Sequence, residues 1–314
     1  MHERVELAVD GPLDLAHTMG LLGMSSRDPT FRVMGRNAIA FATNTPFGVA
    51  SARFAHRGGV VDVDAWGDGA AHVVARAHTL AGLHDRPLDF APEHSGVATL
   101  VRRYPGLRLS AGADPVEIAM HAVVGQRITS GEARQSWWRF VRRYGEPAPG
   151  PLELMAPPRA DVVARLGRDD LLGIGLDLHR SRSLVALARE ADRLRTTSND
   201  VERVSARLRT LPGIGPWTIA LVRHHAFGDA RAVPLDDWHI GRDVCFALSG
   251  QERGDDERML ELLAPFAGNE GRVWRLISAA GIHHPRRSPG RAVNPLLAAY
   301  AGVPRRGFSA PRRR

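Results

Sequence analysis

The sequence predicts an α+β chain: a small antiparallel α/β domain over residues 1–96, an all-α domain over 97–284 and a basic tail over 285–314. The hydrophobic pattern alternates with a period of two in the first part and follows a helical period in the second. The length of 314 residues suits about two domains. With 44% hydrophobic and 24% charged residues, the composition is that of a globular protein.

The N-terminal domain contains short alternating runs separated by turn residues. The runs lie at residues 5–9, 38–42 and 60–66, and glycine-containing turns lie at 45–48 and 57–59. Such runs joined by tight turns predict an antiparallel sheet. Helical stretches are expected beside this sheet, at residues 13–22 and 70–81.

The helical domain begins with clear start signals. Asp114 and Pro115 provide an N-cap and a first-turn proline, and residues 129–132 form a capping box for the next helix. That helix is expected to end at Gly145, and the Pro-rich residues 146–158 are expected to form a loop. The pattern then predicts more helices, about nine in the whole domain, at residues 161–166, 179–194, 200–211, 216–226, 237–248, 256–264 and 271–280.

The basic residues are all arginines, and they are unevenly distributed. The chain has 42 basic and 34 acidic residues, and eight of the arginines lie in residues 285–314, where there is no acid. The rest of the chain is therefore formally neutral. The tail is expected either to contact phosphate or to remain a solvated end.

The composition excludes several kinds of site. One cysteine, Cys245, cannot form an internal disulfide, a structural zinc centre or a four-thiolate iron–sulfur site. The adjacent histidines 224–225 and 283–284 point to different faces, so no metal site is expected. No apolar run reaches the roughly 18 residues of a membrane-spanning helix, and the first residues do not resemble a signal peptide. We therefore expect a cytosolic protein.

The segment Leu211-Pro212-Gly213-Ile214-Gly215 separates two helical patterns. Its glycines are expected to permit a sharp turn, so that a bulky side chain at Gly215 would distort it. Amides exposed at the start of the next helix form an anion site that suits a DNA phosphate. A Gly-x-Gly turn more often simply connects two helices, and the motif alone leaves both interpretations open.

Residues 211–220, LPGIGPWTIA, and 233–240, VPLDDWHI, resemble the hairpin region of the helix-hairpin-helix DNA glycosylase superfamily. Residues 104–109, 114–129 and 171–188 resemble the first half of the same domain. Within the superfamily, the chain is most similar to the DNA-3-methyladenine glycosylase II family, which also carries a small N-terminal α/β domain. The resemblance extends over nearly the whole chain apart from the tail, and it implies a role in base excision repair.

The resemblance implies that Asp237 is the catalytic residue, at the mouth of the base pocket and the start of a helix. Asp236 is the rival, and either aspartate has the structural alternative of capping that helix. The chemistry suits one carboxylate. Cleavage of an N-glycosidic bond develops positive charge on the sugar, which a carboxylate stabilises while it helps to deprotonate the attacking water.

An alkylated purine already carries positive charge, so its pocket needs aromatic faces rather than a general acid. Trp217 and Trp274 match the pocket aromatics of the family, with core packing as the alternative for each. Leu221 stands where the best-known members carry another aromatic residue. This departure leaves the range of bases open.

The resemblance also implies the DNA contacts. Gln126 and Arg127 match the position that fills the gap left by the flipped base, although an ordinary surface arginine is the alternative for Arg127. A monovalent cation held by hairpin carbonyls is the one cofactor that the family allows. The hairpin residues expected to bind DNA are Leu211, Gly213, Ile214, Gly215 and Thr218.

Bifunctional members of the superfamily use a lysine to form an imine with the sugar, and Trp217 occupies the matching position. Because the chain has no lysine, Met1 supplies the one primary amine, and a lysine-dependent lyase activity is excluded. We therefore expect a monomeric, monofunctional glycosylase that removes alkylated purines from double-stranded DNA, associated with the nucleoid through that DNA. The alternatives are a glycosylase for oxidised or mismatched bases and a noncatalytic helix-hairpin-helix DNA-binding protein.

Overall fold

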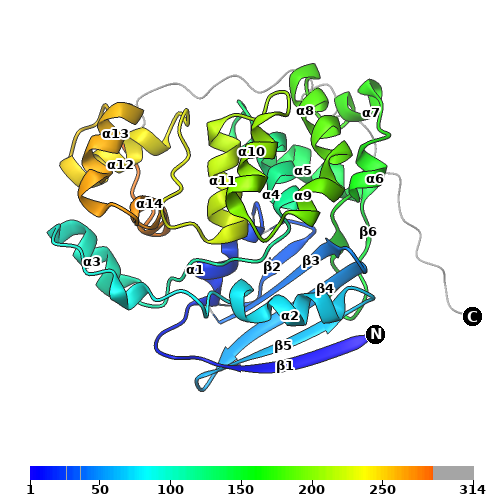
Figure 1. Ribbon diagram of the computed structural model, residues 1–314, viewed down its shortest axis with the longest axis horizontal. Helices are drawn as coiled ribbons and strands as arrows, with labels where there is room; N and C mark the ends of the chain where they lie inside the picture. Colours follow the sequence, from blue (N-terminus) through cyan, green and yellow to red (C-terminus); the bar gives the residue numbers. More distant parts are fainter. Residues whose placement is uncertain (26, 36, 286–314) are drawn as a thin grey trace, which may run out of the picture.

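The computed structural model describes residues 1–25, 27–35 and 37–285, and it confirms the α+β fold class. A five-stranded antiparallel sheet in the order β1-β5-β4-β3-β2 precedes a mostly helical region (Figure 1). β3 and β4 form a tight hairpin in which Thr45 is paired with Gly48. The strands are β1 (His2–Ala8), β2 (Phe31–Val33), β3 (Ala38–Thr45), β4 (Gly48–Arg57) and β5 (Val60–Trp66).

One face of the sheet is covered by α1 (Leu15–Met19) and α2 (Ala70–Leu80). The alternation of β5 explains this packing, because Val61, Val63 and Ala65 are fully buried while the residues between them are partly exposed. The first helical stretch is shorter than expected. After α1 the chain tightens into the 3₁₀ turn η1 (Gly20–Leu22).

The other face of the sheet packs against the segment that was expected to be a loop. This segment contains two paired strands, β6 (Glu146–Pro147) and β7 (Met155–Ala156). Between them, Leu152 and Leu154 pack on alanines of β3. The rest of the segment has no helix or strand, as the loop prediction expects. The two short strands were not predicted, because their pairing depends on contact with the distant sheet rather than on the local Pro-rich sequence.

The expected helix starts at Asp114 and Thr129 are confirmed, since Asp114 accepts from the Val116 amide and Thr129 forms a complete capping box. One continuous helix over 179–194 is wrong, because the chain leaves helical geometry at Glu190 (φ −96°, ψ 3°). The helices are α3 (Ser95–Arg103), α4 (Pro115–Gly125), α5 (Ser130–Tyr144), α6 (Ala160–Val163), α7 (Arg168–Leu172), α8 (Leu178–Arg189), α9 (Ala191–Thr196), α10 (Val201–Arg209), α11 (Pro216–Phe227), α12 (Ile240–Ser249), α13 (Asp256–Leu263) and α14 (Glu270–Ala279), with 3₁₀ turns η2 (Pro87–Asp89) and η3 (Ala264–Phe266).

The helices pack around separate apolar cores. Helices α4, α5, α8, α10 and α11 contribute to one core, and α3, α12, α13 and α14 contribute to another. Figure 1 shows the second group on the left, apart from the helices that stand over the sheet. The helix that opens the helical region, α3, therefore packs against the helices that close it.

Two further expectations concern the ends of the chain and membranes. Among the residues that the structure describes, no helix is long and apolar enough to cross a membrane. The arginines at 286–314 lie outside the described residues. Contact between this tail and phosphate stays a prediction.

Candidate nucleic-acid interface and active site

A groove of about 2520 Å³ lies between the two groups of helices. One wall comes from α4, α5, α11 and the hairpin at 211–215, and the other comes from α12, α13 and the residues before α12. Most of the predicted site residues line this groove together, namely Gln126, Arg127, Gly213, Ile214, Gly215, Trp217, Thr218 and Asp237.

Asp237 is partly buried in the groove, and both of its carboxylate oxygens accept hydrogen bonds. The Trp217 indole Nε1 donates to Oδ2 over 2.9 Å. The amides of His239 and Ile240 donate to Oδ1 over 2.8 and 3.0 Å. The carboxylate thus caps the start of α12 and also lies beside the first turn of α11. The structural and catalytic interpretations of Asp237 are compatible. Its Oδ1 accepts from the amides at the start of α12, while its Oδ2 accepts from Trp217 within the groove.

The neighbouring Asp236 lies in a different setting. Its backbone adopts a left-handed conformation with φ 62°, and its amide donates to Asp256 Oδ2 over 2.5 Å. The side chain is exposed. A positive φ in a non-glycine residue is a strained conformation that clusters at functional sites. Here it turns the chain so that Asp237, rather than Asp236, points back to α11.

The two predicted pocket tryptophans lie in different places. Trp217 is partly exposed in the first turn of α11 and lines the groove. Trp274 is 8% exposed in the core formed with α3, α12 and α13 and is not part of the groove lining. Its ring is parallel to that of His225, which does line the groove, with 6.5 Å between centroids. Trp274 therefore lies one layer behind the groove wall.

The loop between α4 and α5 reaches across to the hairpin. Gln126 Nε2 donates to the Gly213 carbonyl over 2.9 Å and to the Thr218 hydroxyl over 3.0 Å. Arg127 is exposed on the groove and has a left-handed backbone with φ 57°. The fully buried guanidinium of Arg180 fixes the end of α4, donating to the Val124 carbonyl over 2.9 Å. Gln126 therefore bridges the loop to the hairpin, and Arg127 beside it is exposed on the groove.

The two glycine positions of the hairpin differ in whether the backbone and its neighbours require a glycine there. A Cβ at Gly213 would lie 2.1 Å from Ser183 Oγ, and the residue has φ +72°, so only glycine fits without strain. Gly215 has an extended backbone (φ −106°, ψ −175°) and open space where a Cβ would stand. The expectation that the turn itself needs Gly215 is therefore wrong. Open space at Gly215 leaves the start of α11 accessible to a ligand.

The remaining hairpin residues are mostly buried. Ile214 and Thr218 are 6% and 1% exposed, and Leu211 is partly buried against the core of α4, α8 and α11. Their side chains hold the hairpin in place. Within the described residues, the amides of Gly213 and Gly215 donate to no acceptor, so these amides are the groups that remain to bind an anion.

Sequence reasoning missed several residues that line the groove. Trp238 follows Asp237, is 71% exposed and carries the Arg242 guanidinium 4.1 Å from its ring centroid. His121 on α4 and His225 on α11 also line the groove. The spacing of 217, 221 and 225 at four-residue steps was the available signal for His225, because such residues share one helix face. The exposure of Trp238 depends on tertiary packing, so no pattern in the sequence indicates it.

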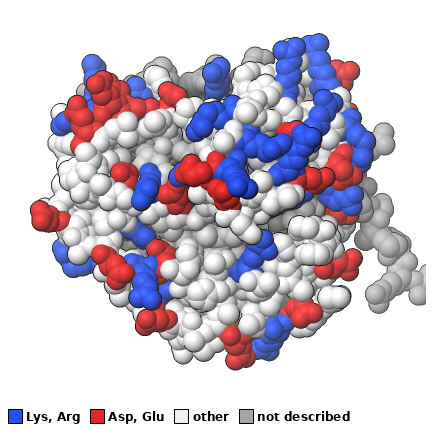
Figure 2. Space-filling model, viewed as in Figure 1, with Lys and Arg blue, Asp and Glu red and all other residues white. Residues whose placement is uncertain are grey.

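Arginines gather on one part of the molecular surface. In Figure 2 they are concentrated at the upper right, over the region that holds α8 and α10 in Figure 1. The exposed arginines of these two helices include Arg182 and Arg189 on α8 and Arg209 at the end of α10, two residues before the hairpin. A basic surface that continues into the hairpin suits a phosphate backbone.

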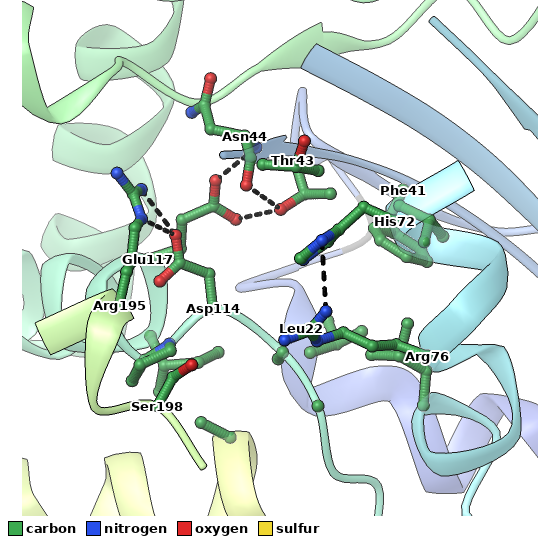
Figure 3. Close-up of a pocket in the computed structure, with 18 of the residues that line it drawn as sticks. Leu22, Phe41, Thr43, Asn44, His72, Arg76, Asp114, Glu117, Arg195 and Ser198 are labelled. Atoms are coloured by element: carbon green, nitrogen blue, oxygen red, sulfur yellow. Dashed lines mark hydrogen bonds and ion pairs between the residues drawn. The ribbon is translucent and has the colours of Figure 1, made fainter. Parts of the chain in front are cut away.

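A second, smaller cavity of about 510 Å³ lies where the sheet meets the helices. Figure 3 shows its polar groups bonded to one another. Glu117 accepts from the Thr43 hydroxyl over 2.7 Å and from the Asn44 amide over 2.6 Å, and Asp114 accepts from Arg195. Burial, and secondarily the charge of Asp114, raise the pKa of Glu117 to about 7. This cavity lies between the sheet and the helices, and hydrogen bonds across it join the two.

The sequence is similar to curated proteins over part of its length, and the fold is similar to solved structures over most of it. No protein-family model matches the sequence. Over 117 residues the chain is 32% identical to "DNA-3-methyladenine glycosylase 2" of Escherichia coli, which covers 36% of this chain and 42% of that protein. The chain is a homologue of DNA-3-methyladenine glycosylase II. It is also 25% identical over 172 residues to the DNA-3-methyladenine glycosylase of Bacillus subtilis, covering 52% of this chain and 56% of the relative. The chain thus spans less than two thirds of the length of these curated relatives.

Solved structures show the same fold over most of the chain. The 3-methyladenine DNA glycosylase from Archaeoglobus fulgidus matches with a TM-score of 0.72 at 17% identity, covering 88% of this chain and 98% of that one. The 8-oxoguanine glycosylase/lyase of Clostridium acetobutylicum, in complex with double-stranded DNA, matches with a TM-score of 0.67 at 12% identity, covering 90% and 98%. These solved structures share the fold of this chain, and the one from Clostridium acetobutylicum contains double-stranded DNA.

Proposed function

We propose that this protein is a monofunctional DNA glycosylase that removes alkylated purines from duplex DNA. The observation that carries the proposal is the Asp237 carboxylate, held in the groove beside the hairpin by the Trp217 indole and the first amides of α12. The DNA-3-methyladenine glycosylase relatives support the substrate class. We also propose that it acts as a monomer on nucleoid DNA in the cytoplasm.

The reaction needs a group that stabilises positive charge on the sugar. As the bond from C1′ to the base breaks, its electron pair leaves with the base and the sugar becomes an oxocarbenium ion. Asp237 lies at the groove with its oxygens already oriented, so little reorganisation is needed when this charge develops. Water then adds to C1′, and Asp237 accepts the proton. Trp217 offers an aromatic face to a cationic base.

The absence of lysine from the sequence supports a monofunctional reaction. A lyase step needs an amine that attacks C1′. The Met1 amine precedes β1 at the edge of the sheet and is not part of the groove lining. The proposed product is therefore an intact strand with an abasic site.

The decisive experiment measures bases released from alkylated duplex DNA by chromatography. We expect 3-methyladenine and 7-methylguanine to appear, with parallel reactions on 8-oxoguanine and mismatched duplexes testing the alternative substrates. Binding to the duplex without release of any base would favour the noncatalytic alternative.

A second assay tests the absence of lyase chemistry. Wild-type protein is expected to leave strands that break only after treatment with alkali, and borohydride is expected to trap no covalent adduct. A trapped adduct would contradict the monofunctional proposal and direct attention to the Met1 amine.

A further inference from the structure

Two helices supply the wall of the groove beyond Asp237. On α11, Trp217, Leu221 and His225 follow one another at four-residue spacing and all line the groove. On the facing α4, Ile118, His121 and Ala122 line it as well. A base flipped toward Trp217 would thus meet, at the far end of this wall, the imidazoles of His225 and His121.

Both imidazoles are uncharged at neutral pH. Burial, followed by the neighbouring His224, Arg275 and His121, lowers the pKa of His225 well below its ordinary value. Burial also lowers the pKa of His121 to about 4. A neutral imidazole keeps one N–H donor and one acceptor nitrogen, so it can recognise a base edge without adding charge.

The ring of His225 is held in place, and its Nε2 lacks a hydrogen-bond partner among the described residues. It is parallel to the Trp274 ring, and its centroid lies 5.6 Å from that of His224. Its Nε2 is buried and forms no hydrogen bond with any described residue. A buried, unpaired polar atom is unfavourable unless a ligand or water satisfies it. The fixed ring is therefore prepared for a partner that the folded chain does not provide.

We propose that His225 determines the base specificity of the groove, forming a hydrogen bond with the edge of the flipped base while adding no charge of its own to that end of the pocket. This inference rests on the glycosylase function proposed above. The neutral ring suits an alkylated purine, because such a base is itself a cation and a charged side chain would repel it. Leu221, a short aliphatic residue between Trp217 and His225, leaves the ring within reach of the base.

The experiment compares two replacements of similar length that differ in charge. His225→Met removes the imidazole, and His225→Arg removes it and adds a fixed cation. We expect the single-turnover release of 7-methylguanine to fall by about tenfold in the first variant and by more than about a hundredfold in the second. His225→Gln, whose amide donates and accepts, is expected to recover most of the rate that His225→Met loses.

The matched controls are His78→Met and His78→Arg on the exposed side of α2, which should leave the rate unchanged. Thermal unfolding of each variant separates loss of fold from loss of recognition. For a neutral substrate, hypoxanthine in duplex DNA, the difference between the Arg and Met variants should shrink. Equal rates for His225→Met and wild type, or for the Arg and Met variants on 7-methylguanine, would overturn the proposal.

A measurement on the wild-type protein keeps the inference testable if the variants unfold. Ring-nitrogen NMR shifts of His225 should move when 3-methyladenine is added with an abasic duplex, and unchanged shifts would contradict the proposed hydrogen bond. Failure of the proposed function looks different, because wild-type protein would then release no alkylated base at all.

Discussion

The groove and the cavity between the sheet and the helices differ in which of their buried polar atoms are left unpaired. In the cavity, Glu117 and Asp114 are bonded to partners on other elements, and Asn44 Oδ1 is the unpaired exception. In the groove, buried atoms of Gln126 and His225 have no partner among the described residues. Asp237 in the groove is fully bonded as well. The two sites therefore differ in the kind of buried atom left unpaired, an amide oxygen in the cavity and an imidazole nitrogen besides an amide oxygen in the groove, and an unpaired buried atom favours a ligand.

The largest effect is expected at Asp237. We predict that Asp237→Asn lowers base release by at least about a hundredfold, since the carboxylate acts on charge that develops in the transition state. Affinity for an abasic duplex should stay within a few-fold of wild type. Single-turnover assays and fluorescence anisotropy measure the two effects. The control is Asp236→Asn, which should keep most activity. Inactivity of that variant with an active Asp237→Asn would show that the catalytic assignment is off by one residue.

The hairpin gives the next test. Gly213→Ala places a Cβ 2.1 Å from Ser183 Oγ at a positive φ, so we predict a loss of about 1–3 kcal/mol of stability with weaker DNA binding. Gly215→Ala meets no neighbour and should leave the melting temperature unchanged. Calorimetry and DNA titration of this pair separate the shape of the turn from its contact with DNA. Equal melting temperatures for both variants would refute the distinction.

Protonation of Glu117 tests the cavity between the sheet and the helices. Because the folded state raises the pKa of Glu117 to about 7, the folded protein binds this proton more tightly than the unfolded chain does. The corresponding stability is complete below the unfolded pKa and is lost as pH rises through 7. Between pH 5 and pH 8, wild type should therefore lose about 2–3 kcal/mol more free energy of unfolding than Glu117→Gln does, as measured by denaturant titration. Parallel pH profiles for the two proteins would contradict this.

The smallest effect is expected from the tail, which we expect to act through its charge alone. Deleting residues 304–314 removes five arginines. We predict a flatter dependence of log affinity on log salt, by about 0.9 for each DNA phosphate that the shortened protein no longer neutralises. Base release at saturating enzyme should not change. An unchanged salt slope would show that the tail does not contact DNA.

Local signals predicted much of the molecule. Asp114 and the 129–132 box located two helices, and alternation located the sheet. The motif around Asp237 brought together residues that do line one groove. Features decided by distant contacts were not predictable. The strand pair β6–β7 depends on the sheet, the need for glycine at 213 depends on Ser183 from α8, and the burial of Trp274 depends on α3 and α12.

The buried guanidinium of Arg180 has a consequence for how this protein can evolve. It donates to the Val124 and Gly175 carbonyls, each over 2.9 Å, and to Asp177, so it fixes the point at which α4 ends. The loop that carries Gln126 and Arg127 starts there. An inserted or deleted residue at this junction would move the Val124 carbonyl away from Arg180 and leave part of a buried guanidinium without its partner. Substitutions within this loop are therefore tolerated more readily than changes of its length at the junction with α4.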